Sequence, residues 1–218
     1  EPGPAFDSWL TVDILLSVGV PAFFSGCMTT TVSNVFPDLA ERPGANAPVA
    51  YVDVPPESVP ADGVTYKHSD DKVRFRSFAT NVYNAMELLE TYRRKHSAMV
   101  TSRLHAWLPG RSIGIAVDFQ PKNRSDIRFA GLIDTTDAEF NAIRDGINAK
   151  LERVMTAILS GEKPAAVYAL WRALTADDVA AAERRHTATS AALAPVGGVA
   201  DDVARAVATT TTRAGTQR

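Results

Sequence analysis

The sequence predicts an α/β fold, with a Rossmann-like, mostly parallel sheet and helices on both of its faces. Short apolar runs alternate with segments of helical periodicity from residue 8 to residue 159. Strands that are separated by helices need crossover connections, which are typical of parallel sheets. A hydrophobic content of 45% and a charged content of 22% are ordinary for a globular domain.

The N-terminal part predicts a helix, a short strand and a long loop. The helix is expected over Ser8–Val18, where apolar residues recur at helical spacing. Ser8 can cap its first turn, and Gly19 can end it. A short buried strand is expected at Pro21–Phe24. The segment 25–48 is rich in Ser, Thr, Gly, Pro and Asn, so we expect a loop there.

Four further strands are expected in the middle of the chain, at Val49–Val54, Val64–Lys67, Ala98–Val100 and Ile113–Val117. The segment Lys72–Arg94, between the second and third of these, predicts the clearest helix. Its apolar stripe consists of Phe75, Phe78, Ala79, Val82, Met86 and Leu89. We expect this stripe to cover the sheet.

The C-terminal part predicts helices and then a tail. A long helix is expected over Asp137–Leu159, because Thr136 and Glu139 form a capping box ahead of a periodic apolar face. Two short helices are expected at Val167–Leu174 and Asp177–Arg185. The expected organisation is a Rossmann-like domain over 1–163, C-terminal helices packing on it over 164–186, and a disordered Ala/Thr-rich tail over 187–218.

Composition argues against several functional classes. A net charge of −2 gives no basic field for nucleic acid, and no apolar run reaches the roughly 20 residues that span a bilayer. The single cysteine fits a reducing, cytoplasmic compartment. Scattered histidines predict no metal site, and the dinucleotide, P-loop and hydrolase-elbow motifs are missing. The chain begins on Glu1 rather than on methionine, so we expect it to be a piece of a longer protein.

The segment 98–109 carries the main candidate site. An apolar run ends in hydroxyl residues, and Arg103 and His105 follow where a helix is expected to begin. With Ser102 as the expected N-cap, the first helical amides and the Arg103 cation favour a phosphate or carboxylate ligand. A second interpretation stays open, in which Arg103 pairs with a nearby acid and His105 is a packing residue.

The segment 25–31 is the second candidate. Gly26 permits a close backbone approach, and the hydroxyls of Thr29, Thr30 and Thr31 can bind a phosphate or a sugar. Cys27 is a possible nucleophile, but the pattern favours a small buried side chain at that position.

Two charged segments are weaker candidates. Lys67 and His68 follow a strand, and His68 is either a second acid/base group or a solvated loop residue. Arg128 belongs to a charged stretch over 122–128, which is either at the same sheet edge or a solvated loop.

Four segments, in order, resemble the polysaccharide pyruvyl transferase family over about residues 3–135. Phe23–Val32 is similar to its Ser-Gly-Cys-Leu-Thr loop, and 73–92 to its long helix. Val100–Pro109 matches its Val-Thr-Ser-Arg-Leu-His-x-x-Leu-Pro signature, and Asp126–Leu132 its Asp-x-Arg-Phe-x-Gly-Leu element.

This resemblance implies transfer of a pyruvyl group from phosphoenolpyruvate onto two hydroxyls of a polysaccharide or glycan sugar, with no cofactor beyond that donor. It implies the C-terminal, donor-side half of a GT-B-type fold, and hence a missing N-terminal domain or partner chain. It also implies a cytoplasmic protein, or one at the inner membrane face beside polysaccharide-assembly machinery. Leu104 and His105 carry over as donor contacts, whereas a donor-anchoring role for Arg103 is inferred from its charge.

We therefore expect His105 and Arg103 to be catalytic. The expected donor-binding residues are Leu104, Ser102, Ser25, Gly26, Thr29 and Thr30. Two alternatives stay open: a nucleotide-sugar glycosyltransferase domain, and a non-catalytic glycan-binding or interaction fragment.

Overall fold

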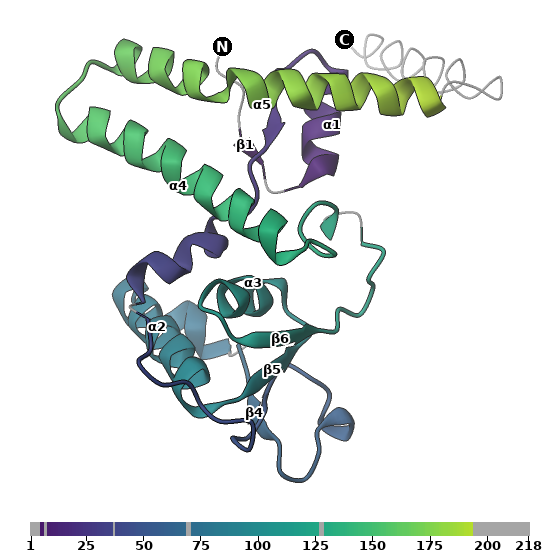
Figure 1. Ribbon diagram of the computed structural model, residues 1–218, viewed down its shortest axis with the longest axis vertical. Helices are drawn as coiled ribbons and strands as arrows, with labels where there is room; N and C mark the ends of the chain where they lie inside the picture. Colours follow the sequence, from purple (N-terminus) through teal and green to yellow (C-terminus); the bar gives the residue numbers. More distant parts are fainter. Residues whose placement is uncertain (1–4, 7, 37, 69–70, 127–128, 194–218) are drawn as a thin grey trace, which may run out of the picture.

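The fold in the computed structural model is α/β, with a four-stranded, all-parallel sheet and helices around it (Figure 1). The structure describes residues 5–6, 8–36, 38–68, 71–126 and 129–193. The sheet has the strand order β4-β3-β5-β6. The fold class predicted from the sequence is confirmed.

The strands of the sheet end together along one edge. They are β3 (Ala50–Val52), β4 (Val64–Tyr66), β5 (Ala98–Thr101) and β6 (Ala116–Phe119). Val52 is paired with Tyr66 on one side and with Thr101 on the other, so the residues that follow these strands meet at the carboxyl edge. In open parallel sheets this edge is where ligands bind.

The last strand begins later than expected. The sequence pattern predicted it at Ile113–Val117, but β6 runs over Ala116–Phe119. Helix α3 (Leu104–Ser112) continues up to this region, and Gly114 then turns the chain with φ = 77°. A glycine adopts that backbone conformation without strain, so the turn takes the residues that the pattern assigned to the strand.

The helix expected over 72–94 is broken near its start. A 3₁₀ helix, η3 (Asp71–Phe75), precedes α2 (Phe78–Lys95), whose N-cap Ser77 accepts a hydrogen bond from the Thr80 amide. The expected burial of the apolar stripe is wrong at this end, because Phe75 and Phe78 are 80% and 84% exposed. Only the C-terminal end of α2 is well buried, chiefly through Tyr92, which packs against β3 and β5.

The expected loop after residue 24 contains η1 (Met28–Val35), a 3₁₀ helix. The Thr30 hydroxyl donates to the Cys27 carbonyl, which satisfies a backbone acceptor locally. Ser112 at the end of α3 then donates to the Thr30 carbonyl and accepts from the Ser33 amide. These bonds hold η1 against α3. A shorter 3₁₀ turn, η2 (Pro56–Ser58), follows β3.

The C-terminal helices form an antiparallel pair that leads away from the sheet (Figure 1). Helix α4 (Asp137–Leu159) has the predicted bounds and the predicted capping box. The two short helices expected after it are one helix, α5 (Pro164–Leu193), in which Thr175 donates its hydroxyl to the Trp171 carbonyl. Residues 187–193 of the expected tail are therefore helical, and 194–218 lie outside the described residues.

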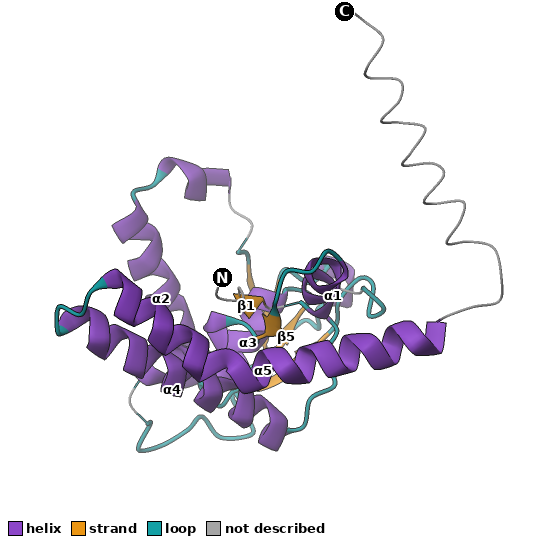
Figure 2. Ribbon diagram, turned by 90° about the horizontal axis from the view of Figure 1, so that it is seen from above, coloured by secondary structure: helices purple, strands orange, loops and turns teal. Residues whose placement is uncertain are grey.

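The N-terminal segment forms a separate small layer under α5. Strands β1 (Ala5–Phe6) and β2 (Phe23–Phe24) pair in parallel, so β2 does not join the main sheet as we expected. Between them, α1 (Trp9–Ser17) packs with β2 against α5, and Figure 2 shows α1 lying beside α5. Ser8 is at the N-cap of α1 as predicted, but its side chain makes no capping hydrogen bond.

In the described part of the chain, each helix is too short or too polar to cross a membrane.

We predict that replacing Gly110 will destabilise the protein through the packing of α3 on the sheet. A Cβ at this position would lie 2.5 Å from the Met99 methyl and 3.1 Å from a Val117 methyl, and Met99 is fully buried. Gly110→Val should lower the free energy of unfolding by about 1–3 kcal/mol, measured by chemical denaturation. Gly44→Val is the control, because a Cβ there meets nothing within 4 Å. Equal losses in both variants would contradict the prediction.

Candidate functional site

A cleft of about 750 Å³ lies at the carboxyl edge of the sheet. Helix α1 supplies one wall, and the segments that follow β4 and β5 supply the other. The lining residues are Ser8, Leu10, Thr11, His68, Ser102, Arg103, Leu104, His105, Phe129 and Leu132. The structure thus brings together Ser102, Arg103, Leu104, His105 and His68 from the sequence prediction.

Asp53 connects the strand ends at the base of this cleft. Its carboxylate accepts a hydrogen bond from Arg103 Nε at 3.0 Å, within an ion pair, and another from the His68 amide at 3.3 Å. Ser102 donates its hydroxyl to the Asp53 carbonyl at 2.9 Å. The Asp53 backbone has φ = 52°, a left-handed conformation that Asp tolerates better than most residues.

The sequence reasoning missed Asp53. An acidic residue at the end of a buried strand, directly before Val54-Pro55-Pro56, was the available signal. The ion pair also agrees with the alternative that Arg103 pairs with an acid. The Arg103 side chain nevertheless stays 51% exposed and lines the cleft, whereas the Asp53 side chain is only 8% exposed.

Helix α3 points its N-terminus at the cleft. Its N-cap is Arg103 rather than the expected Ser102, because Ser102 uses its hydroxyl on Asp53. The amides of Ala106 and Trp107 both donate to the Arg103 carbonyl, so those of Leu104 and His105 precede the hydrogen-bond ladder of the helix. Such first-turn amides carry the positive end of the helix dipole and favour an anion.

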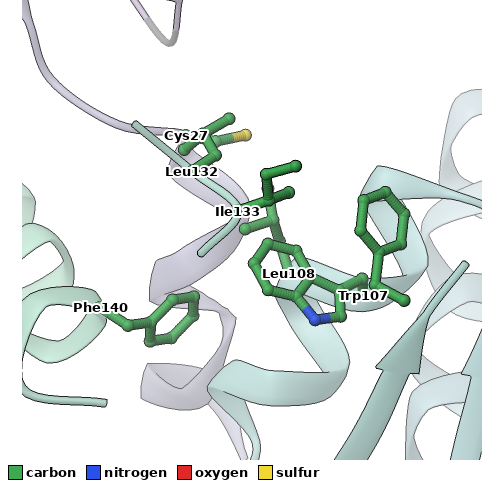
Figure 3. Packing of buried hydrophobic residues seen from close by; sticks show 7 residues of the cluster. Cys27, Trp107, Leu108, Leu132, Ile133 and Phe140 are labelled. Carbon is green, nitrogen blue, oxygen red and sulfur yellow. The ribbon is translucent and has the colours of Figure 1, made fainter. Parts of the chain in front are cut away.

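Cys27 contacts His105 from behind. The cysteine is at the N-cap of η1 and is 7% exposed, in a cluster with Leu108 and Leu132 (Figure 3). Its thiol hydrogen-bonds to His105, and to Thr29 Oγ1 at 3.2 Å. Burial raises the pKa of this thiol, but the hydrogen bonds with His105 and Thr29 outweigh burial, so that its pKa lies below the ordinary value.

The sequence reasoning treated Cys27 mainly as a small buried residue. It is buried, but it also pairs with the histidine of the main candidate site. The two residues are far apart in the chain, so only the packing of η1 on α3 brings them together.

His68 is held from the other side by Tyr92. Its Nε2 lies 2.9 Å from the Tyr92 hydroxyl, and the two rings stack with centroids 6.0 Å apart. Burial lowers the pKa of His68, the Asp53 carboxylate opposes this, and the Arg103 cation adds to it, so the net direction is downward. The imidazole is therefore neutral at neutral pH.

The remaining candidates are placed differently. Ser25 and Gly26 line a second, apolar pocket of about 700 Å³ between α4 and α5 rather than the cleft. A Cβ on Gly26 would lie 2.2 Å from an Ile143 methyl, so the close approach that this glycine permits is that of α4. Thr29 and Thr30 bond to Cys27.

Lys67 is exposed and is not among the residues that line the cleft. Arg128 lies outside the described residues. In the described ranges, no three His, Cys, Asp or Glu side chains gather in a group that could hold a metal ion.

The chain matches no known family model, no curated protein and no solved structure.

We predict that the Cys27 thiol titrates below its ordinary value and that His105 and Thr29 cause this. His105→Ala and Thr29→Val should each raise the thiol pKa, because each removes a hydrogen bond that opposes burial. The pH dependence of iodoacetamide alkylation measures this, and the single cysteine makes the signal unambiguous. Thr31→Val is the control, since the Thr31 hydroxyl donates to the Met28 carbonyl and not to Cys27. A wild-type midpoint above the ordinary value would refute the assignment.

We also predict opposite shifts of the His68 pKa in two charge variants. Arg103→Gln removes a cation that disfavours imidazolium and should raise the pKa of His68, whereas Asp53→Asn removes a carboxylate that favours it and should lower that pKa. Nuclear magnetic resonance titration of the ring measures both, with the four histidines assigned by substitution. Shifts in the same direction in both variants would show that these charges do not act on His68 as described.

Proposed function

We propose that the cleft binds phosphoenolpyruvate and that the protein transfers its pyruvyl group onto two hydroxyls of a glycan or polysaccharide sugar. The observation that carries this proposal is the convergence of Arg103, His105 and His68 with the first turn of α3 at the carboxyl edge of the sheet. The resemblance of 100–109 to the pyruvyl transferase signature supplies the choice of donor.

The donor matches the charges of the cleft. Phosphoenolpyruvate carries a carboxylate and a phosphate, both of which bind well to guanidinium groups and to helix N-termini. Arg103 is half-exposed and lies beside the first-turn amides of Leu104 and His105. In the proposed complex, these groups hold the two anionic ends of the donor.

The proposed reaction adds one proton to the donor and removes one proton from each of the two sugar hydroxyls. The methylene carbon of the donor gains a proton, both sugar oxygens bond to the neighbouring carbon, and the bond from that carbon to the phosphate oxygen breaks. Of the two protons lost by the sugar hydroxyls, one balances the new methyl group and the other leaves with phosphate. We assign the first proton transfer to His105, because an imidazole suits acid/base work near neutral pH.

Cys27 supports this assignment by its position. The buried thiol hydrogen-bonds to the His105 ring, so the ring has a fixed neighbour. A held imidazole transfers a proton more effectively than one that rotates freely.

We predict that phosphoenolpyruvate binds to the full chain and that Arg103→Gln weakens this binding about tenfold or more, measured by calorimetry. His105→Gln should bind the donor but release phosphate about 10²–10⁴-fold more slowly in the presence of acceptor oligosaccharides. Arg184→Gln, an exposed arginine on α5, is the control for loss of one positive charge. Mass spectrometry of the oligosaccharides should show the added ketal.

Two outcomes would overturn the proposal. Binding of a nucleotide sugar without binding of phosphoenolpyruvate would indicate a glycosyltransferase domain instead. Binding of oligosaccharide alone, with no mass gain, would indicate a non-catalytic glycan-binding fragment.

A further inference from the structure

Two tyrosine–histidine pairs lie side by side behind the cleft. Tyr92 contacts Nε2 of His68 at 2.9 Å, and Tyr66 contacts Nε2 of His96 at 2.7 Å. The two tyrosine rings meet edge to face with centroids 4.9 Å apart. His96 is 4% exposed, whereas His68 lines the cleft.

The buried pair shows which atom donates. His96 Nδ1 lies 3.0 Å from the Pro48 carbonyl, which can only accept, so Nδ1 carries the hydrogen. With the hydrogen on Nδ1, Nε2 can accept, and the Tyr66 hydroxyl donates to it. This pair therefore has a fixed tautomer, set by one hydrogen bond on each ring nitrogen.

The same direction follows for Tyr92 and His68. Tyr92 is fully buried, and among the described residues His68 is the hydrogen-bond partner of its hydroxyl. If the ring donated instead, the tyrosine hydrogen would be buried without an acceptor, which costs about 1–3 kcal/mol. Tyr92 also stays protonated, because burial, with Tyr66 and Asp53 nearby, raises its pKa far above the ordinary value.

We propose that Tyr92 is a positioning residue that holds neutral His68 as the Nδ1–H tautomer, so that His68 offers a hydrogen-bond donor to an anionic oxygen in the cleft. In the His96 pair, the Pro48 carbonyl accepts the corresponding hydrogen. In the His68 pair, an oxygen of the ligand would accept the Nδ1 hydrogen instead. The identity of the ligand as phosphoenolpyruvate rests on the proposed function, whereas the tautomer does not.

This inference changes the role of His68. Sequence reasoning left it as a second acid/base group or a solvated residue. In the neutral ring, the lone pair of Nε2 accepts the hydrogen bond from Tyr92, and Nδ1 carries the hydrogen. His68 therefore has no free lone pair with which to take a proton from the ligand. It therefore binds and orients the donor, and His105 is left as the group that transfers protons.

The ring nitrogens of His68 test the tautomer directly. In the ligand-free wild-type protein, nitrogen-15 spectra should show Nδ1 protonated and Nε2 unprotonated. Tyr92→Phe should populate the Nε2–H form, because the hydroxyl that donates to Nε2 is gone. Tyr66→Phe is the matched control: it removes a hydroxyl from the same aromatic cluster, and should change the His96 signals while leaving those of His68.

Binding then tests the consequence. Tyr92→Phe should weaken phosphoenolpyruvate binding roughly three- to tenfold by calorimetry, and Tyr66→Phe should not. His68→Ala should weaken it at least as much, and adding Tyr92→Phe to His68→Ala should cause no further loss, because Tyr92 acts only through the ring.

An Nε2–H tautomer in the wild-type protein would overturn the inference, and so would a loss in Tyr92→Phe that persists in the His68→Ala background. Failure of the wild-type protein to bind phosphoenolpyruvate would overturn the proposed function instead. The nitrogen-15 spectra of the ligand-free protein would still decide whether Tyr92 sets the tautomer.

Discussion

The carboxylate of Asp53 is the interaction on which the geometry of the cleft depends. It is 8% exposed, and a charge at that depth is tolerated only when it is paired and hydrogen-bonded. Arg103 from the end of β5 and the His68 amide after β4 meet this need, and the Ser102 hydroxyl adds a bond to the Asp53 carbonyl. The ends of three strands are thus fixed around one anion. Moving any one of them would leave the carboxylate buried with fewer partners, so the cleft is rigid where the candidate residues emerge.

The same arrangement gives the two imidazoles of the cleft different surroundings. His68 has a buried tyrosine hydroxyl on Nε2, while His105 has a buried thiol against its ring. Each histidine is therefore held by a side chain from an element packed behind it, α2 in one case and η1 in the other. Two side chains of the same titratable type commonly take different roles in acid/base chemistry when their hydrogen-bond partners differ. The roles that we propose, proton transfer for His105 and hydrogen bonding for His68, follow that rule.

Sequence reasoning succeeded where local chemistry decides the structure and failed where tertiary contacts do. The capping box of Thr136 and Glu139 fixed the start of α4, and alternating apolar runs located all four strands of the sheet. The 3₁₀ helix η1 was missed because its stability comes from Ser112 on a distant helix as well as from its own threonines. For the candidate site, the order of residues pointed to the segment 102–105, which lines the cleft. Asp53, Tyr92 and the thiol contact of Cys27 depend on strand register and helix packing, which periodicity does not reveal.

The charge balance of the cleft bears on which anions it suits. The positive charge of Arg103 is largely offset by Asp53 at 3.0 Å, so net charge alone attracts a ligand weakly. The remaining attraction comes from donors of fixed direction: the first-turn amides of α3, the outer face of the guanidinium, and in our proposal the Nδ1–H of His68. Directional donors reward oxygens in particular positions, whereas an unpaired cation would bind any compact anion. Phosphoenolpyruvate, the ligand that we propose, carries its carboxylate and its phosphate on one carbon and presents oxygens in several directions at once. The proposed ligand therefore matches these directional donors better than inorganic phosphate, which lacks the carboxylate.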